Sequence, residues 1–349
     1  MRKISIGNKK IGTGEPCFII AEAGVNHNGS LDRAKKLIDA AYESGADAVK
    51  FQTFSADRIA SRAARKADYQ MRTTDSEESQ YAMLKKLELP PEAFPILAEY
   101  AKEKGIVFLS SPFDCVSVDI LEEAGVDAYK IPSGEITNIP LLRYIAGKKK
   151  PIILSTGMAE IDEIARAVDL FRNAGIRDLI LLHCVTSYPA PPDTLNLQVI
   201  KTLRRTFRLP VGFSDHSPGV LDAVIARVLG ACVIEKHFTL DKNLPGPDHQ
   251  ASLEPDELAA MVAAVRMTDL SLGDGKKNII PAEQAIKSIA RKSLVARVDI
   301  PANAIITPEL IDVKRPGTGI PPGDFDRVIG MIASHRIPGD TVLTWEDLR

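Results

Sequence analysis

Short apolar runs rich in β-branched residues alternate with longer amphipathic stretches over most of the chain. Within the runs, apolar and polar residues do not alternate, which is typical of strands buried on both faces. Helix-length stretches such as 31–44 and 161–173 separate the runs, so neighbouring strands are expected to be parallel. The runs lie at 17–20, 46–51, 106–109, 127–131, 151–154, 179–182, 210–213 and 231–234. Eight such units predict an α/β fold, a (β/α)8 TIM barrel, with a final helix near 255–272.

A doubly wound open sheet is the main structural alternative, because it shows the same alternation of strands and helices. That fold places a Gly-rich dinucleotide fingerprint after its first strand. Here the first strand is followed by EAGVNHNG (22–29), which lacks the fingerprint. The sequence therefore favours the barrel.

The pattern changes after residues 273–277, where short apolar runs broken by Pro and Gly replace the strand–helix units. We interpret 1–276 as the barrel domain, 277–288 as a linker and 289–349 as a small β-rich domain. A domain of this size is small for an independent core. We expect it to pack on its own barrel or on a second copy of the chain.

Composition narrows the class of protein. Lys and Arg total 44 and Asp and Glu total 46, a net charge of −2, so neither nucleic acid nor an anionic membrane is expected as a partner. No apolar run approaches the roughly 18 residues of a membrane span, and the first residues lack the apolar core of a signal peptide. The four cysteines are scattered. A cytoplasmic protein is the expectation.

Polar residues follow every apolar run, at the position where each strand of a barrel would end. Active sites of TIM barrels lie at this end of the strands. One such residue means little, but eight groups that meet at one barrel mouth form a candidate site. The groups are Glu22, Asn26 and His27; Lys50 and Gln52; Ser110 and Ser111; Lys130, Ser133 and Glu135; Ser155 and Gly157; His183, Thr186 and Tyr188; Ser214, Asp215 and His216; and Glu235 and His237.

Lys50 and Lys130, with the hydroxyls of Ser133 and Ser155, have the chemistry to hold a phosphate or a carboxylate. Each lysine taken alone is equally compatible with a strand-end residue that extends to solvent. His216 and His237 end adjacent predicted strands and can converge on one divalent ion. Mn²⁺, Mg²⁺, Fe²⁺ and Zn²⁺ fit such a pair about equally well.

Carboxylates for proton transfer, or for support of a metal, come from several of these units. Burial decides their protonation, so the sequence does not rank them. The loop 244–252 adds one more carboxylate after the eighth strand and could also be a simple connector to the last helix. The candidates are Glu22, Glu135, Asp215, Glu235 and Asp248, whereas His27 and His183 are expected to have hydrogen-bonding or packing roles.

Several of these segments together resemble one family. They are EAGVNHNG (22–29), KFQT (50–53), SGE (133–135), SDH (214–216), EKHFT (235–239) and GPDH (246–249). The chain resembles the N-acetylneuraminate (sialic acid) synthase family over nearly its whole length. Its tail, with KRPGTGI (314–320), is similar to the antifreeze-like (SAF) domain of that family.

The resemblance implies condensation of phosphoenolpyruvate with an N-acylated hexosamine aldehyde, giving a nine-carbon 2-keto sugar acid and phosphate. It implies Mn²⁺ or Mg²⁺ on His216 and His237, and a homodimer whose swapped C-terminal domain presents Arg315 to the partner's barrel. It places Lys50 at the carboxylate of phosphoenolpyruvate and Glu135 where protons are handled. The phosphate is matched to Lys130, Ser133, Ser155 and Ser214, and the sugar to Glu22, Gln52, Tyr188 and Asp248. Glu22, Glu135 and Asp248 are the candidate catalytic carboxylates.

One position departs from the family pattern. Thr186 stands where sialic acid synthases tend to have asparagine, so its contact with phosphate is in doubt and the sugar could differ. We favour N-acetylmannosamine, with legionaminic or pseudaminic acid synthesis from a diacetamido-trideoxyhexose as the alternative. Two readings from other classes are a Schiff-base aldolase that uses Lys130 or Lys50, and a carbohydrate-binding protein without catalysis.

Overall fold

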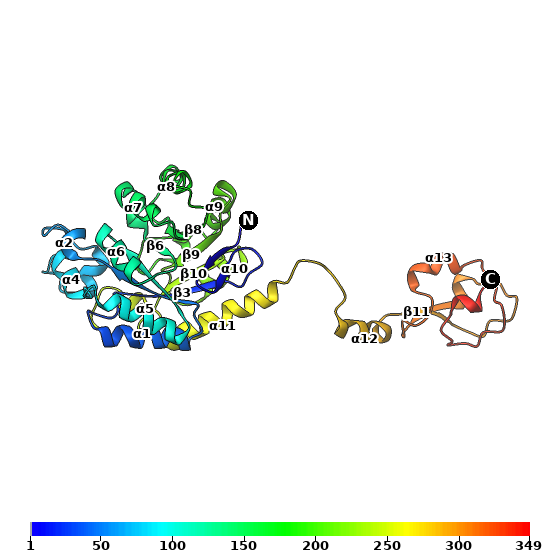
Figure 1. Cartoon of the computed structure of the whole chain (residues 1–349). Helices are drawn as coiled ribbons and strands as arrows, with labels where there is room; N and C mark the ends of the chain where they lie inside the picture. Colours follow the sequence, from blue (N-terminus) through cyan, green and yellow to red (C-terminus); the bar gives the residue numbers. More distant parts are fainter. Residues whose placement is uncertain (1) are drawn as a thin grey trace. The chain divides into compact units, whose positions relative to one another are not determined.

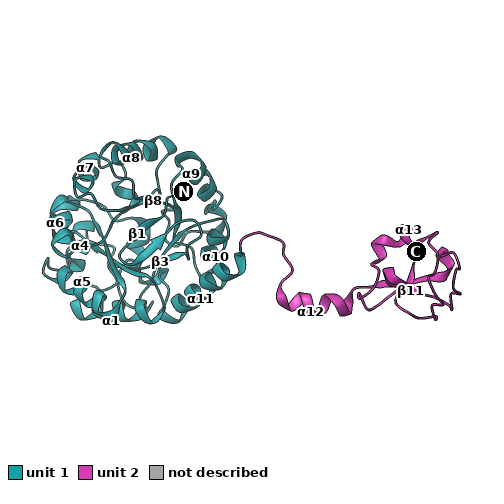
Figure 2. Cartoon of the chain, turned by 45° about the vertical axis from the view of Figure 1, so that its right-hand side comes forward, with its two compact units in different colours: residues 1–273 teal, residues 274–349 magenta. Residues whose placement is uncertain are grey.

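The computed structural model describes residues 2–349 and divides into two compact units, one that ends at Gly273 and a second, Asp274–Arg349 (Figure 2). The segment predicted as a linker, 277–288, contains most of helix α12 (Pro281–Ala290).

The first unit contains an eight-stranded parallel sheet with helices around it (Figure 1). The strands are β3 (Phe18–Gly24), β4 (Ala48–Thr53), β5 (Val107–Pro112), β6 (Tyr129–Ile131), β7 (Ile152–Ser155), β8 (Leu179–Cys184), β9 (Val211–Asp215) and β10 (Val233–His237). Their order is β5-β4-β3-β10-β9-β8-β7-β6. β5 and β6 also contact each other, so the sheet is a nearly closed barrel and the predicted fold class is confirmed.

Helices follow the strands and pack on their outer side. They are α1 (Leu31–Glu43), α5 (Ala93–Lys104), α6 (Cys115–Glu123), α7 (Ile139–Gly147), α8 (Ile161–Asn173), α9 (Val199–Phe207), α10 (Leu221–Val228) and α11 (Pro255–Leu272). Local sequence sets their ends: Ser30 caps α1 by accepting a hydrogen bond from the Arg33 amide, and Gly105 ends α5 with a φ of 85°.

The alternation of side chains along each strand separates two cores. Ile19, Ala21 and Val49 belong to the large cluster between strands and helices. Ile20, Ala48 and their neighbours at the same level belong to a second cluster, which fills the interior of the barrel. The remaining interior members are Phe18, Val107, Leu109, Ala128, Ile153, Ile180, Leu182, Cys232 and Val233.

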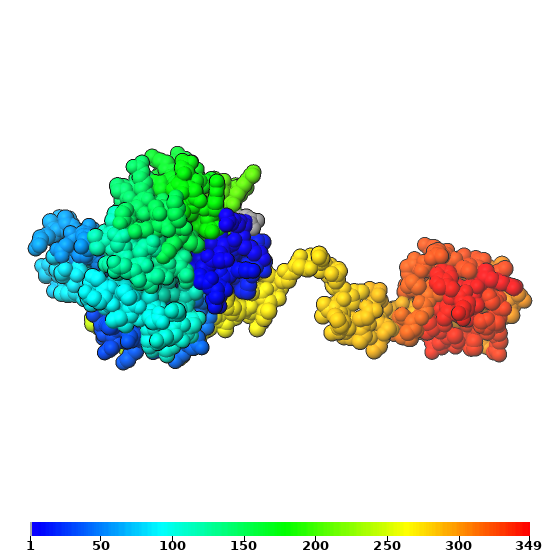
Figure 3. Space-filling view, viewed as in Figure 1, coloured from blue at the N-terminus to red at the C-terminus, as the bar shows by residue number. Residues whose placement is uncertain are grey.

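A short antiparallel hairpin closes the amino-terminal end of the barrel. Its strands are β1 (Ile4–Ile6) and β2 (Lys9–Ile11), and Ile4, Ile6 and Ile11 join the interior cluster. Figure 2 shows β1 across the centre of the ring of helices, and Figure 3 shows the hairpin in blue at the surface of the unit. Any site inside the barrel therefore opens at the opposite end.

Three short helices between β4 and α5 interrupt the regular pattern, and the sequence did not reveal them. They are α2 (Ala56–Ile59), α3 (Asp68–Thr73) and α4 (Gln80–Leu87). We call residues 56–87 the α2–α4 insertion. Inside it, the Lys66 ammonium lies 3.6 Å from the Glu78 carboxylate and donates a hydrogen bond to Thr74 Oγ1 at 2.9 Å.

The second unit is small and β-rich, as predicted. β11 (Ser293–Ala296) and β12 (Ile311–Lys314) form an antiparallel pair, and α13 (Phe325–Val328) packs nearby. Its core contains Leu294, Ile300, Ile320 and Leu343, each at most 1% exposed. Across residues 2–349, no helix has the length and apolar character needed to cross a bilayer.

Candidate active site

Toward the carboxyl ends of the strands, ionisable and hydroxyl side chains replace the apolar ones in the barrel interior. On β3, Glu22 follows Phe18 and Ile20 at the same two-residue spacing, so its side chain also points into the barrel. The strand register pairs Glu22 with Lys50 on β4 and with His237 on β10. The same register aligns Ser214 on β9 with Glu235 on β10. The predicted convergence at the carboxyl ends of the strands is therefore present.

Four buried charges form a chain across this interior. The Lys50 ammonium lies 2.8 Å from the Glu22 carboxylate and 3.8 Å from Glu235, and the Lys130 ammonium lies 3.1 Å from Glu235. Each of these side chains is at most 5% exposed. Buried charges are tolerated when they are paired. Two cations and two anions balance, and an anionic ligand would compete with Glu22 and Glu235 for the two ammonium groups.

The carboxyl groups, which the sequence could not rank, differ in pKa because they differ in burial and in their charged or hydrogen-bonding neighbours. Burial raises the pKa of Glu22 to about 7, against the opposing effect of Lys50. Burial also acts to raise the pKa of Glu235, but the two lysines outweigh it and lower that pKa to about 2. Burial raises the pKa of Asp248 to about 6, and burial also raises that of Glu135, which is half-buried and bonded to Asn138 at 2.7 Å.

Hydroxyl groups surround Gly157 beside this chain of charges. A β-carbon at Gly157 would collide with Thr186 Oγ1 and Cys184 Sγ and would lie 3.2 Å from Ser133 Oγ. Ser155 Oγ is buried and lacks a hydrogen-bond partner within residues 2–349. Hydroxyl groups with unused hydrogen-bonding capacity around a glycine make a cradle that suits phosphate oxygens. Thr186, the residue that departs from the family pattern, belongs to this cradle.

The two predicted metal ligands lie side by side, with ring centroids 5.5 Å apart. His216 Nδ1 donates to the Val185 carbonyl at 2.8 Å, which leaves Nε2 as the nitrogen that can bind a metal. His237 Nδ1 is buried and has no hydrogen-bond partner in the described chain. Burial lowers the pKa of His216 to about 4 and that of His237 well below its usual value, so both rings are neutral near pH 7.

Neutral imidazoles are the ligand form, so this pair fits a divalent ion that also takes oxygen ligands. Within the described residues, His, Cys, Asp and Glu form no cluster of three or more that could hold a metal. The rest of a coordination sphere would have to come from water and substrate.

A cavity of about 110 Å³ lies above the charged layer, next to His237. Its polar lining includes Gln52, Tyr69, Tyr188 and Asp248. Gln52 and His237 each lie two residues beyond a charged interior residue on the same strand, so the backbone of Lys50 and of Glu235 lies about 6 Å deeper along these strands. Gly24, at the end of β3, has a φ of 53°, a backbone conformation that favours glycine, and its α-carbon lies against Gln52 and His237.

An aromatic stack connects the α2–α4 insertion to the histidine pair. The Tyr69 and Tyr188 ring centroids are 5.0 Å apart, and Tyr188 lies 4.2 Å from His216. Thr73 Oγ1 also donates to the Pro247 carbonyl at 3.3 Å. The sequence did not point to the members of the insertion that line the cavity, because nothing local shows where an irregular insertion docks. These residues are Tyr69, Gln70, Met83, Leu84 and Leu87.

Some predicted residues lie outside this group. Asp215 points to the opposite side of β9 from Ser214 and pairs with Lys236 at 2.8 Å, and its part in proton transfer or in support of a metal stays a prediction. His27 accepts a hydrogen bond from the Gly29 amide and His183 contacts the Leu195 carbonyl, which confirms their hydrogen-bonding roles. Arg315 is in the second unit, where its Nε donates to the Ala290 carbonyl.

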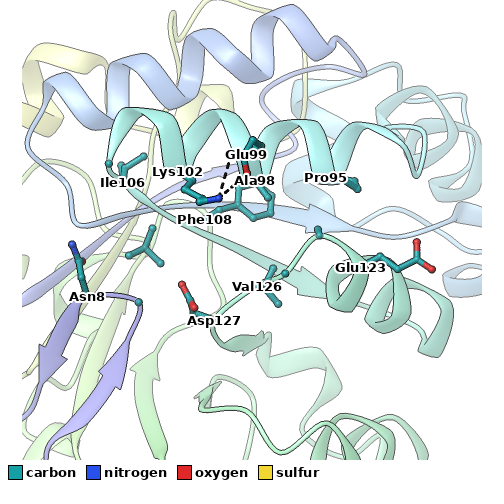
Figure 4. A pocket seen from close by; sticks show the side chains of 15 residues that line it. Asn8, Pro95, Ala98, Glu99, Lys102, Ile106, Phe108, Glu123, Val126 and Asp127 are labelled. Atoms are coloured by element: carbon teal, nitrogen blue, oxygen red, sulfur yellow. Dashed lines mark hydrogen bonds and ion pairs between the residues drawn. The ribbon is translucent and has the colours of Figure 1, made fainter.

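A larger cavity, of about 700 Å³, lies at the amino-terminal end of the barrel (Figure 4). α5, the start of β5 and the segment before β6 line it, with Ile106, Phe108 and Val126 among the apolar residues. Its charged helix residues Glu99 and Lys102 form an exposed pair at 3.1 Å. The buried ionisable groups that converge are therefore at the carboxyl ends of the strands, and the size of a cavity alone does not identify the site.

Comparison with known proteins gives consistent matches. The model of the NeuB family matches residues 37–277, and that of the SAF domain matches 291–349. An N,N'-diacetyllegionaminic acid synthase of Legionella pneumophila is 46% identical over 99% of this chain and 98% of its own. A Campylobacter jejuni protein of the same name is 49% identical over 93% and 98%. A crystal structure of the N-acetylneuraminic acid synthetase of Leptospira borgpetersenii, in complex with citrate, has a TM-score of 0.72 and 38% identity, covering 82% of this chain and 95% of that one.

Proposed function

The chain belongs to the NeuB family of sugar acid synthases, and on this premise we propose that it makes a legionaminic-type acid from phosphoenolpyruvate and a 2,4-diacetamido-trideoxymannose. The observation that supports this sugar is the identity of 46% and 49% to two N,N'-diacetyllegionaminic acid synthases, against 38% to a sialic acid synthetase. This reverses the preference for N-acetylmannosamine stated from the sequence.

The reaction joins C3 of phosphoenolpyruvate to the aldehyde carbon of the open-chain sugar. Water supplies the oxygen that becomes the 2-keto group, and phosphate leaves. We assign the enolpyruvyl carboxylate to Lys50 and the phosphate to Lys130 with the hydroxyls near Gly157 and on β9. The hydroxyls and ammonium groups are already oriented for an anion, which would compete with Glu22 and Glu235 for the two lysines. The phosphate residues are Lys130, Ser133, Ser155, Thr186 and Ser214.

His216 and His237 would hold Mn²⁺ or Mg²⁺, and the bound ion would polarise the sugar aldehyde, an effect worth several kcal/mol. The Val185 carbonyl orients the His216 ring for this task. Gln52, Tyr188 and Asp248 line the cavity beside His237 and would hold the sugar hydroxyls. Glu22 and Glu135 are the carboxyl groups that we propose for proton transfer near the reacting carbons.

We also propose a homodimer in which Arg315 of each second unit completes the barrel site of the partner copy. Arg315 is exposed, and a guanidinium on a Pro-Gly turn can bind an acyl oxygen with little loss of conformational freedom.

Phosphate release from phosphoenolpyruvate tests the proposal most directly. We expect release with the diacetamido sugar, with dependence on Mn²⁺ or Mg²⁺ after treatment with a chelator. A higher kcat/KM for N-acetylmannosamine would return the assignment to sialic acid synthesis. A borohydride-stable adduct with pyruvate, formed without a metal, would support the Schiff-base aldolase instead.

A further inference from the structure

One side of the 110 Å³ cavity is apolar. Val25, Met83, Leu84 and Leu87 line it, and we call these residues the apolar wall. Val25, Met83 and Leu87 are at most 6% exposed, and Leu84 is partly buried against them. Phe54, Ile59 and Phe113 pack in the same cluster without lining the cavity. The wall is therefore held in place by neighbouring side chains.

The rest of the lining includes the polar residues Gln52, His237 and Asp248. This inference rests on the proposed function, in which the sugar aldehyde lies at the histidines. The aldehyde carbon is one end of an open-chain sugar. The substituents at the other end, on C4 to C6, then extend toward the apolar wall.

Two polar residues of the insertion line the cavity, Tyr69 and Gln70. Gln70 Oε1 accepts from the Ala67 amide at 3.1 Å, and Gln70 Nε2 donates to Tyr69 Oη at 3.4 Å. The Gln70 oxygen and one of its two N–H groups are therefore engaged within the insertion, and the side chains of the wall offer no hydrogen-bonding group. A hydroxyl group placed against the wall would give up its hydrogen bonds to water and find no replacement.

We propose that the apolar wall is the specificity determinant for the sugar and selects a methyl group at C6 over a hydroxymethyl group. A methyl group fills the space without a desolvation cost, and the methyl of a second acetamido group can share the wall. Apolar pockets reject an added hydroxyl only moderately, by up to about a hundredfold. We therefore expect kcat/KM to favour the 6-deoxy sugar by roughly tenfold to a hundredfold.

The first test uses the wild-type protein at saturating phosphoenolpyruvate. It compares N-acetylmannosamine with its 6-deoxy analogue, which differ only in one oxygen atom, and includes the diacetamido sugar. A clear preference for the 6-deoxy analogue supports the wall. Equal kcat/KM values, with phosphate released from both, overturn the wall and leave the proposed function intact. Phosphate release from none of the three contradicts the proposed function itself, and the wall falls with it.

The second test changes the wall. Leu84→Gln places an amide beside the distal end of the sugar, so the preference for the 6-deoxy analogue should fall by about tenfold while the KM for phosphoenolpyruvate stays unchanged. Ile59→Gln is the matched control, because Ile59 packs in the same cluster without lining the cavity. An equal change in both variants would indicate a general loss of packing and overturn the assignment. If Leu84→Gln does not fold, the wild-type comparison still decides the matter.

Discussion

The mouth of the barrel has two halves that are built differently. Strand residues at fixed register carry the anion half, with Lys50, Lys130 and Glu235 buried and ion-paired. The sugar half combines strand ends with loops and the α2–α4 insertion, including Tyr69 and Tyr188. Strands fix the groups that we propose for phosphoenolpyruvate, and irregular segments surround the cavity that we propose for the sugar. Changes in each half should therefore affect different kinetic constants.

The largest loss of activity should come from changes to His216 and His237, the proposed metal ligands. His216→Ala should abolish turnover, by about a thousandfold or more, because a Lewis acid contributes several kcal/mol to the transition state. Phosphate release measures the loss, and circular dichroism should show that the fold is intact. Full activity in a chelator-treated His216→Ala protein would rule out the metal assignment.

A change confined to the anion half should be smaller and selective. Lys130→Ala removes a charge-assisted hydrogen bond worth about 1.5–3 kcal/mol, so kcat/KM for phosphoenolpyruvate should fall roughly ten- to a hundredfold. The preference between the two sugars should not change, since the sugar half is untouched. If kcat and KM both keep their wild-type values, Lys130 serves only to pair with Glu235.

The proposed dimer extends the sugar half to a second chain. Arg315→Ala should lower kcat/KM for the sugar about tenfold, at the lower end of the range for a charged hydrogen bond. Exchange of Arg315→Ala subunits with His216→Ala subunits should restore part of the activity, because one site of each swapped heterodimer carries neither lesion. If heterodimers form and activity does not recover, Arg315 serves its own barrel or none.

The smallest effect concerns pH and again separates the halves. The pKa of Asp248 is about 6, so its carboxylate is the main form at pH 7 and the minor form at pH 5. A carboxylate accepts hydrogen bonds from sugar hydroxyls without a competing proton, so the sugar KM should rise roughly tenfold between these pH values. Asp248→Asn should flatten the profile. An equal slope in that variant would show that another group is responsible.

The two halves also differ in how well the sequence predicted them. Lys50, Lys130 and His237 were found because parallel strands end together and side chains alternate with a period of two, rules that hold without tertiary detail. The alternation of side chains along β9 also places Ser214 and Asp215 on opposite sides of the strand, and Asp215 pairs with Lys236 on the outer side.

The sugar half was predicted incompletely. Tyr188 and Asp248 were candidates because they follow predicted strands, and the family resemblance matched them to the sugar. Tyr69, Met83 and Leu84 had no signal, because docking of the α2–α4 insertion depends on long-range contacts such as that of Thr73 with Pro247. The comparisons favour the alternative over N-acetylmannosamine, and most residues of the apolar wall (Met83, Leu84 and Leu87) lie outside the motifs on which that preference rested. Burial, which ranks Glu22, Asp248 and Glu235 by pKa, is likewise a property of the folded chain.

The β1–β2 hairpin closes one end of the barrel, so substrates and products can pass only through the other end. Ile4, Ile6 and Ile11 seal the closed end, each at most 1% exposed. The backbone of Lys50 and of Glu235 lies about 6 Å deeper along the strands than that of Gln52 and His237, so a sugar that binds first would obstruct the path of phosphoenolpyruvate. Binding should therefore be ordered, with phosphoenolpyruvate first, and the sugar acid must leave before phosphate can follow it out. An excess of sugar should then inhibit turnover, because sugar bound to the free enzyme blocks the entry of phosphoenolpyruvate. The closed amino-terminal end of the barrel thus determines the order in which substrates bind and products leave.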